Sequence, residues 1–236
     1  VGLEVGTTFY IKNAGTGDDS TAQLFLQTAE SDIAANDVLG KINFQAPNEG
    51  TGTDAILVAA AIQAKSEGDF SSSSNATSLE FMTGASEAAT VKFAIASDGS
   101  LSTPTAGTSN VRFGVNAGNV IESGGNYNVV IGDEAGTSLT TGDNNTAIGY
   151  QAGDAITTGG GNVAIGQGAF SAEDTGSNHV AIGKDALNAL NVGGNSNVAV
   201  GLNALKVNVS GGNNTAIGTN TLAAQNTSGT ATDTHN

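Results

Sequence analysis

The chain has 236 residues, of which 22 are acidic and 7 are basic, so its net charge is −15. A polyanion is not attracted to a phosphate backbone or to an anionic bilayer, which disfavours nucleic-acid binding and membrane-surface roles. Cysteine is absent, which excludes disulfides, thiolate metal sites and cysteine nucleophiles.

The composition also limits the kind of core that can form. Glycine supplies 34 residues and proline only 2, which excludes collagen. Aromatic residues make up 5% of the chain and tryptophan is absent, so small and aliphatic side chains must fill a thin, regular core. No apolar run approaches the roughly 18 residues of a membrane span, and we expect no membrane insertion. Because the chain begins at Val1 without a signal-peptide pattern, we expect a fragment or a processed product.

Residues 1–104 are predicted to form an antiparallel β domain. Short runs alternate between apolar and polar residues, as in "KINFQA", where Ile42 and Phe44 share one face. Stretches rich in glycine, serine, asparagine and aspartate, such as "PNEGTGTD" and "EGDFSSSSN", separate these runs. The pair Asp98-Gly99 predicts a tight turn between two of the strands.

One run within this domain has two readings. The alanines of "DAILVAAAIQAKSEG", residues 54–68, favour a helix. The apolar residues at every second position, bounded by turn signals, favour a strand. We prefer the strand.

From residue 105 the chain repeats a unit of 17 or 18 residues. Each unit contains an "AIG"-like triplet, and the glycine that ends the triplet is the anchor of the unit. One unit alone cannot bury its own apolar face. Stacking the units about 4.8 Å apart turns each aligned position into a ladder, so we predict a seven-rung parallel β-solenoid over residues 105–222. A helical repeat is disfavoured because glycine, threonine and asparagine are poor helix formers. The anchor glycines are Gly114, Gly132, Gly149, Gly166, Gly183, Gly201 and Gly218.

The aligned columns predict a role for each position of the unit. Asparagine stands four residues before the anchor in six units, which predicts a hydrogen-bonded ladder. β-Branched residues stand three and one positions before the anchor in nearly every unit, and we expect members such as Thr146 and Ile148 to face the core. The alanine between them, such as Ala147, should form a flat second face, and Ala152 should also permit close packing. The anchor glycine predicts a turn with positive φ or a close approach of rungs.

The ends of the repeat differ from its middle, as capping units do. The first unit has Arg112 and Phe113 where most later units have alanine and isoleucine. The last unit has Thr221 in a column that is otherwise alanine. Residues 223–236 are predicted to form a polar, poorly ordered C-terminal tail.

Two sets of motifs resemble known proteins. The repeats "NNTAIGYQAG" and "TTGGGNVAIG" resemble those in the tail fibres of tailed bacteriophages of the marine and cyanophage type. The runs "DVLGKINFQAP", "AAAIQAKSEGDFSS", "TSLEFMTG" and "KFAIASDGSL" resemble the β domain that often precedes such repeats. This resemblance covers roughly residues 36–222. The repeats are similar, in a looser form, to the head domains of bacterial trimeric autotransporter adhesins.

The resemblance implies an elongated homotrimer in a virion tail appendage, which contacts other tail proteins and a glycan or protein of the host surface. It often implies a C-terminal chaperone of the endosialidase type that drives trimerisation and is cleaved off. A physical argument also favours association, because an aromatic-poor chain buries little surface alone and a flat alanine face lets copies approach closely. The alternatives are a bacterial trimeric surface adhesin on the cell exterior and, less favoured, a β-helical polysaccharide depolymerase.

The sequence predicts no catalytic activity. A glycosidase needs two carboxyl groups roughly 5 to 9.5 Å apart. Glu134 and Asp185 share a column three rungs apart, which is about 14 Å at the usual strand spacing. No serine, histidine and aspartate set is visible, and no lysine follows the glycine-rich turns as a phosphate loop requires.

We also expect no cofactor and no bound metal. The glycine- and aspartate-rich calcium-binding repeat is absent. The stretches "GDD" at residues 17–19 and "GDNN" at residues 142–145 form Asx turns more often than ion sites. His179 interrupts the asparagine column, and we interpret it as a rung substitution rather than a ligand.

Three aromatic residues are candidates for surface binding. Glycan sites favour exposed aromatic side chains with amide neighbours, and Tyr127, Tyr150 and Phe170 interrupt otherwise small or polar positions. The competing interpretation is ordinary packing or surface exposure. An ice-binding surface is disfavoured because only Thr146 and Thr215 supply threonine to the strand column.

Overall fold

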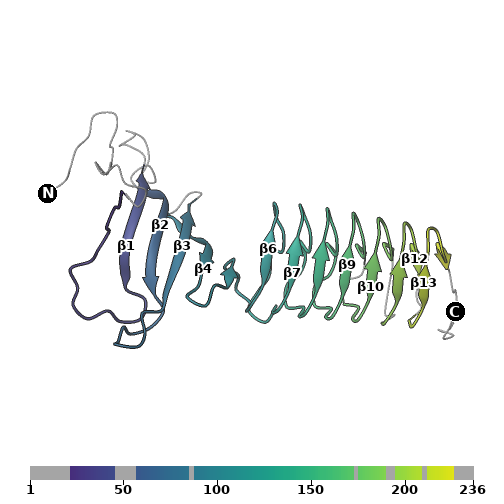
Figure 1. The fold of residues 1–236 in the computed structure, drawn as a ribbon. Helices are drawn as coiled ribbons and strands as arrows, with labels where there is room; N and C mark the ends of the chain where they lie inside the picture. The colour runs from purple at the N-terminus through teal and green to yellow at the C-terminus, as the bar shows by residue number, and fades with distance from the viewer. Residues whose placement is uncertain are drawn as a thin grey trace. The chain divides into compact units, whose positions relative to one another are not determined.

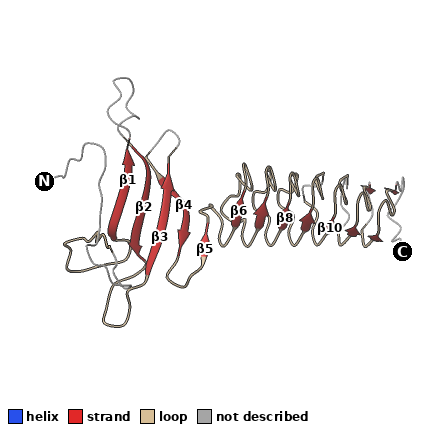
Figure 2. Cartoon of the chain, turned by 45° about the horizontal axis from the view of Figure 1, so that its top comes forward, coloured by secondary structure: helices blue, strands red, loops and turns tan. Residues whose placement is uncertain are grey.

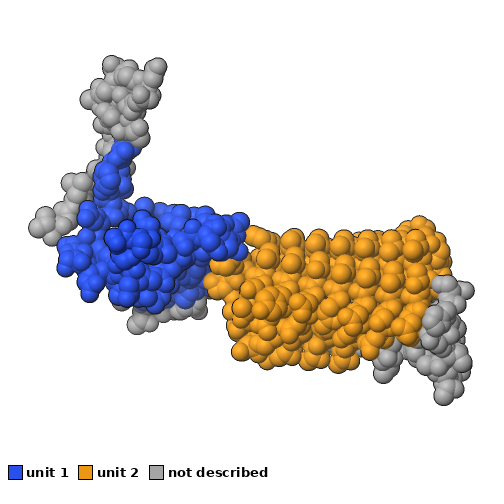
Figure 3. Space-filling view, turned by 60° about the horizontal axis from the view of Figure 1, so that its bottom comes forward, with its two compact units in different colours: residues 1–101 blue, residues 102–236 orange. Residues whose placement is uncertain are grey.

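A computed structural model describes residues 22–45, 57–84, 88–172, 175–189, 195–208 and 212–225. The described residues form strands and turns and no helix, which confirms the all-β prediction (Figure 2). The chain divides into two compact units, residues 1–101 and 102–236, coloured separately in Figure 3. The sequence prediction had placed this boundary after residue 104.

Unit 1 contains a five-stranded sheet with the strands in sequence order (Figure 1). Its strands are β1 (Val38–Gln45), β2 (Val58–Ser66), β3 (Thr77–Thr83), β4 (Thr90–Ile95) and β5 (Leu101–Ser102). The first four pair antiparallel, as predicted. The strand reading of residues 54–68 is confirmed by β2, although residues 54–56 lie outside the described residues.

The alanine-rich β2 is a strand because both of its edges are paired. Ile62 lies opposite Ile42 of β1 and Phe81 of β3, and Phe81 lies opposite Phe93 of β4. The ring centroids of Phe81 and Phe93 are 5.8 Å apart. Cross-strand pairs of this kind outweigh the helix preference of isolated alanines. They also give the sheet one continuous apolar face.

The opposite face of the sheet is polar and closely packed. The Gln63 amide donates a hydrogen bond of 2.6 Å to the buried Glu80 carboxylate. Lys65 pairs with the same carboxylate at 3.0 Å. These contacts supply the partners that a buried carboxylate requires. At the end of the sheet, Gly99 has φ +83° and donates to the Ala96 carbonyl, so the predicted turn at Asp98-Gly99 is confirmed.

Unit 2 is a parallel β-solenoid, as the repeat predicted (Figure 1). Its strands pair in register, so that Ala147 lies opposite Val130 and Ala164. Seven strands of three residues form the main sheet: β6 (Val111–Phe113), β7 (Val129–Ile131), β8 (Thr146–Ile148), β9 (Val163–Ile165), β10 (Val180–Ile182), β11 (Val198–Val200) and β13 (Thr215–Ile217). Below, these strands define rungs one to seven.

A second, two-stranded sheet lies in the last two rungs, where β12 (Val207–Asn208) and β14 (Ala224–Gln225) pair in parallel. The predicted polar tail began at residue 223, but β14 continues the paired structure to Gln225. Residues 226–236 lie outside the described residues.

The anchor glycines satisfy both conditions that the sequence suggested. Their φ angles lie between +122° and +132°, which side chains other than glycine rarely adopt. A Cβ placed on Gly149 would lie 2.8 Å from the carbonyl carbon of Gly166 in the next rung. Glycine is therefore required by backbone conformation and by the stacking of rungs.

The asparagine ladder is confirmed. The Asn145 side-chain oxygen accepts the N–H of Asn162 at 3.0 Å, and its amide donates to the Gly159 carbonyl at 2.8 Å. The Asn145 N–H in turn donates to the Asn128 side chain at 2.8 Å. The ladder residues are buried, so each amide satisfies backbone groups that water cannot reach. The ladder runs through Asn110, Asn128, Asn145, Asn162, His179, Asn197 and Asn214.

The predicted orientation of the strands was wrong. Thr146 and Ile148 point away from the core, whereas Ala147 between them is buried. A second buried alanine column, three residues after each of the first six anchors, belongs to the same core cluster. Two columns of methyl groups leave no room for two β-branched side chains per rung, so the larger residues lie outside. The inward strand column, at most 2% exposed, is Val130, Ala147, Ala164, Ala181, Ala199 and Ala216.

The remaining core volume comes from two different positions of the unit. In rungs one to three it is filled seven residues after the anchor, by Ile121, Leu139 and Ile156. In rungs four to six it is filled four residues after the anchor, by Phe170, Leu187 and Leu205. The earlier rungs have glycine at this second position, because a Cβ on Gly153 would lie 2.9 Å from Ile156 Cδ1.

The first rung is closed by polar contacts. Arg112 occupies the inward column, and its Nε donates to the Ala117 carbonyl at 2.6 Å. Burial lowers the pKa of the Arg112 guanidinium. The Arg112 N–H donates to Thr103 Oγ1, and the Asn110 amide donates to Thr105 Oγ1. These bonds satisfy groups that a preceding rung would otherwise satisfy, which supports the interpretation of this unit as a cap.

The exchange of core positions predicts a compensating pair of substitutions. Gly153→Leu alone should destabilise unit 2 through the clash with Ile156, and Ile156→Ala alone should cost about 2–4 kcal/mol through the cavity that it leaves. The double variant places leucine at the position that Leu187 and Leu205 fill in rungs five and six, where leucine adopts φ near +50°. We expect denaturant unfolding to give a coupling energy above about 1 kcal/mol in favour of the double variant. If the stability losses of the two single variants simply add in the double variant, the two positions do not exchange their role in the core.

Candidate functional site

The outward side chains of the seven main strands form one continuous surface, which we call the outer sheet face. Ladder neighbours half-bury most of its members, while Phe113, Ile182, Thr215 and Ile217 are exposed, up to 69% at Ile217. All fourteen residues are apolar or threonine. They are Val111, Val129, Thr146, Val163, Val180, Val198 and Thr215, followed by Phe113, Ile131, Ile148, Ile165, Ile182, Val200 and Ile217.

No charged residue interrupts the outer sheet face, although the chain carries 22 acids. Seven strands of three residues at the usual β spacings cover on the order of 300 Å². Contiguous apolar patches of this size on soluble chains commonly mark interaction sites. A parallel sheet is usually covered on both faces. The outer sheet face is therefore the leading candidate for a functional surface.

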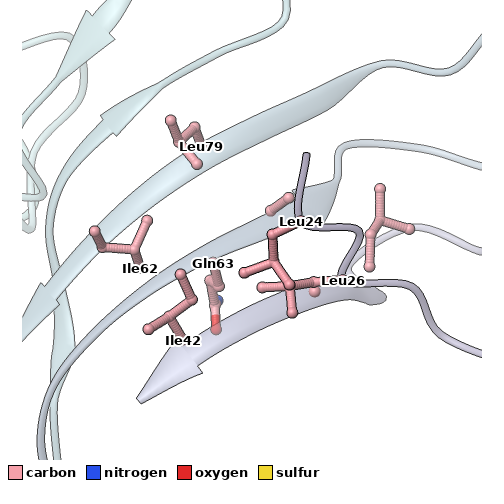
Figure 4. A pocket seen from close by; sticks show the side chains of 9 residues that line it. Leu24, Leu26, Ile42, Ile62, Gln63 and Leu79 are labelled. Carbon is pink, nitrogen blue, oxygen red and sulfur yellow. The ribbon is translucent and has the colours of Figure 1, made fainter. Parts of the chain in front are cut away.

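Unit 1 has an apolar surface of its own on its sheet (Figure 4). Leu24 and Leu26 lie over β1, and the Thr28 N–H donates to the Leu39 carbonyl at 3.1 Å. A groove of about 290 Å³ runs beside them between Ile42, Ile62 and Leu79. Its one polar lining side chain, Gln63, donates to Glu80. The groove thus offers apolar contact and few groups that would orient a polar substrate.

Tyr127 is an exposed aromatic residue in an unusual backbone conformation. It is 60% exposed and has φ +58°. The same position in the other rungs holds asparagine, serine or glycine with φ between +57° and +70°. Asparagine and glycine adopt this conformation more readily than tyrosine does. Neither core packing nor backbone preference accounts for a tyrosine here, so it remains a candidate for surface binding.

Tyr150 is also exposed, at 45%, but it lies away from Tyr127. Tyr127 stands two residues before β7, whereas Tyr150 stands two residues after β8. Because β7 and β8 are parallel neighbours, the two tyrosines lie at opposite ends of their strands. They do not form one site.

Phe170 was a wrong candidate for surface binding. It is fully buried and its ring packs against His179, with the ring centroids 4.8 Å apart. Phe170 fills the core of rung four, where the unit has no apolar residue seven positions after the anchor. Glycine in the earlier rungs at its position, together with Leu187 and Leu205 in the later ones, was the sequence signal for this role.

The polar side chains two residues after the anchors have separate partners. The Gln151 amide donates to Glu134 at 2.7 Å, while Lys206 pairs with Asp185 at 3.2 Å. The two carboxyl groups considered as a glycosidase pair therefore have different partners in different rungs. The absence of catalysis stays a prediction.

The stretch at residues 142–145 uses its side-chain oxygens within the solenoid. Asp143 Oδ1 accepts the Asn126 N–H at 2.6 Å, and Asn145 Oδ1 accepts the Asn162 N–H in the asparagine ladder. Within the described ranges, no group of three or more histidine, aspartate or glutamate side chains is placed to hold a metal ion. Residues 17–19 lie outside those ranges. The same ranges contain no helix with the length and hydropathy of a membrane span.

The surroundings of Asp154 disfavour the ionised form of its carboxyl group. Desolvation raises the pKa of its carboxyl group, and the nearby Glu134 carboxylate raises it further. Its Oδ1 is buried and has no hydrogen-bond partner among the described residues. The folded chain therefore holds a proton at Asp154 more tightly than the unfolded chain does, and the ionised form lowers stability.

Asp154→Asn should stabilise the chain at pH 7, by up to the roughly 0.5 kcal/mol typical of partly exposed positions. The gain should shrink as the pH falls through the folded-state pKa and vanish near pH 3, where the wild-type carboxyl is neutral in both states. Denaturant unfolding at both pH values measures the difference. Asp133→Asn, which changes the net charge equally at an exposed position, is the control. Equal gains in both variants would show that overall charge, not desolvation, is responsible.

Comparisons of the chain with models of protein families, with curated proteins and with solved structures gave no match.

Proposed function

We propose that the chain is a structural and adhesive segment of a bacteriophage tail fibre, which assembles as a homotrimer and attaches the virion to a glycan or protein of the host surface. The observation that carries the proposal is the outer sheet face, seven strands long and without a charge. The repeat motifs that resemble those of phage fibres supply the biological context.

A second copy of the chain fits the outer sheet face for two reasons. The face consists of β-branched side chains at regular spacing, so the ridges of one copy match the grooves between the rungs of another. A net charge of −15 makes copies repel one another, and the face is the uncharged strip on which that repulsion is weakest. The face requires at least one partner copy, and the number three follows from the resemblance.

This arrangement replaces the alanine face that the sequence had suggested for association. Alanine faces inward and holds the coil together, while valine and isoleucine face outward. Burial of β-branched side chains contributes more per residue than burial of alanine, because more apolar area leaves water. The corrected orientation therefore strengthens the case for self-association.

Attachment would use groups away from the outer sheet face. Tyr127 and Tyr150 stand beyond the two ends of the strands, where association through the strands leaves them accessible. Catalysis is not part of the proposal, because Glu134 and Asp185 are engaged in separate pairs. Cleavage of a polysaccharide by the purified chain would overturn this point and favour a depolymerase.

The assembly is tested by a charge placed on the outer sheet face. The intact wild-type chain should sediment at three times the 23.1 kDa of one copy. Ile148→Asp should sediment as a single copy, because symmetry brings the introduced carboxylates together in an apolar interface. Its circular dichroism should stay that of a β-protein, since Ile148 lies outside the core.

Asn119→Asp is the matched control, because it adds the same charge at an exposed turn of rung one. This variant should sediment like the wild type. A single-copy wild type would refute the assembly, and an associated Ile148→Asp variant would place the interface elsewhere.

The location is tested by antibodies raised against the purified chain. In electron micrographs of material from the source of the sequence, the label should decorate the tail appendages of phage particles. Label on bacterial cell surfaces would instead support the trimeric adhesin. Label on neither phage appendages nor cell surfaces would contradict both assignments.

A further inference from the structure

We propose that Tyr127 and Asn144 form a binding site for an uncharged glycan on one edge of the solenoid. Each stands two positions before a strand of the main sheet, Tyr127 before β7 and Asn144 before β8. Because these strands pair in register, the two residues are neighbours about 4.8 Å apart along the stack. The inference rests on the proposed attachment role and deepens it, since it selects one exposed tyrosine and the class of ligand.

The backbone of Tyr127 has a conformation that suits other residues better. Its φ of +58° lies in the left-handed region, which the next two rungs enter with Asn144 at +60° and Gly161 at +70°. The Tyr127 N–H donates to the Thr108 carbonyl at 2.9 Å, so contact with the preceding rung fixes this conformation. A tyrosine here costs stability relative to asparagine, and at 60% exposure it adds little to the core. Residues held at such a cost cluster at functional sites.

The Asn144 amide lies exposed beside this ring. The Asn144 main-chain N–H donates to the Asn126 carbonyl at 3.0 Å, whereas its side chain makes no hydrogen bond to any described residue. The neighbouring Asn145 differs, because its amide is buried and bonded to backbone groups. The Asn144 side chain therefore presents both a donor and an acceptor to a ligand.

The next two rungs extend the same edge. Gly161 follows Asn144 in the column, and the side-chain oxygen of Asn178 in rung five lies 2.8 Å from the point that a Cβ on Gly161 would occupy. The Asn178 side chain therefore lies over this glycine, on the Asn144 side of its own rung. Three rung spacings separate Tyr127 from Asn178, about 14 Å, so the edge suits an oligosaccharide chain rather than a single sugar.

An aromatic ring followed by amides matches the surface of a sugar. One face of a hexose carries C–H groups that pack on an aromatic ring, and its hydroxyls donate and accept as an amide does. A protein ligand fits less well, because the strongest contacts at protein interfaces are shielded from water by surrounding residues. On this edge the column neighbours of Tyr127 are Ser109 and Asn144, which are small and exposed.

The charge around the site selects an uncharged ligand. Residues 113–183, which contain Tyr127, Asn144 and Asn178, hold seven acids and no lysine or arginine. An anionic polysaccharide would be repelled by this segment and would find no cation to pair with it. A neutral glycan loses nothing to this field, because its hydroxyls need hydrogen-bonding groups rather than counter-charges.

Native gel electrophoresis of the intact chain tests the site, because a chain of net charge −15 migrates while an uncharged polysaccharide cast into the gel does not. Gels that contain dextran, mannan or galactan are compared with a gel that contains none. The wild type should be retarded in at least one of them, and retardation in none would overturn the glycan assignment in favour of a protein ligand. Beads that carry the anionic polysaccharide alginate should retain no chain, and retention would overturn the choice of an uncharged ligand.

Tyr127→Asn separates recognition from folding. It introduces the residue that stands at this position in rungs three, five and seven, and it leaves the net charge unchanged. We expect the dissociation constant obtained from retardation to rise at least tenfold. The denaturant midpoint should stay equal or rise, because asparagine adopts φ near +60° more readily than tyrosine does. Retardation equal to that of the wild type would overturn the site.

Ser196→Asn is the matched control, because it places the same residue in the same column at rung six, where φ is +62°. It should be retarded like the wild type, and a loss equal to that of Tyr127→Asn would overturn the assignment to Tyr127. Asn144→Gly removes the amide, keeps a residue that suits positive φ and should weaken binding several-fold. Wild-type affinity in Asn144→Gly would overturn the pairing of ring and amide.

The two proposals fail in different measurements. Retardation reports carbohydrate binding, whereas sedimentation reports assembly. A wild-type trimer that no polysaccharide retards would refute the glycan site and leave the assembly standing. A single copy that is retarded would refute the assembly and leave the site standing.

Discussion

Each rung of the solenoid has to accept a nearly identical rung about 4.8 Å away, and the other properties of unit 2 follow from this spacing. A Cβ at the anchor would collide with the next rung, so the anchor is glycine. A side chain that stacks on its own copy must donate and accept at once, as the asparagine amide does. Like charges repel at this distance, and accordingly Glu134 is followed in its column by Gln151, and Asp185 by Asn203.

The sequence was sufficient to predict the solenoid, its seven strands, its anchors and its ladder, because these are backbone requirements that every unit repeats. It did not reveal which strand face lies inside. Alternation separates two faces without ranking them, and the rule that larger apolar residues lie inside fails in a coil this thin. The second alanine column, represented by Ala152, was the overlooked signal, since a wall of methyl groups implies a narrow interior.

The candidate site depended on that missing orientation. With valine and isoleucine placed inside, the sequence predicted no apolar surface on the strands, and single aromatic residues became the candidates for a site. Phe170 shows the limit of judging one residue against its column, because its role is set by what stands three positions later in the other rungs. In unit 1, β2 likewise depends on residues elsewhere in the chain. Its strand conformation is set by pairing with β1 and β3, which the helix preference of its own alanines does not reflect.

The exchange of core positions between rungs three and four divides the solenoid into two classes of unit. Within one class, a unit of 17 or 18 residues could be duplicated or lost as whole codons, and each such event would change the length by one strand spacing. A copy moved across the boundary would bring its bulky residue to a different core position from that of its new neighbours, so that like side chains would no longer stack on one another. Unit 2 can therefore be lengthened by copying units within either segment, but not by exchanging units between the two segments.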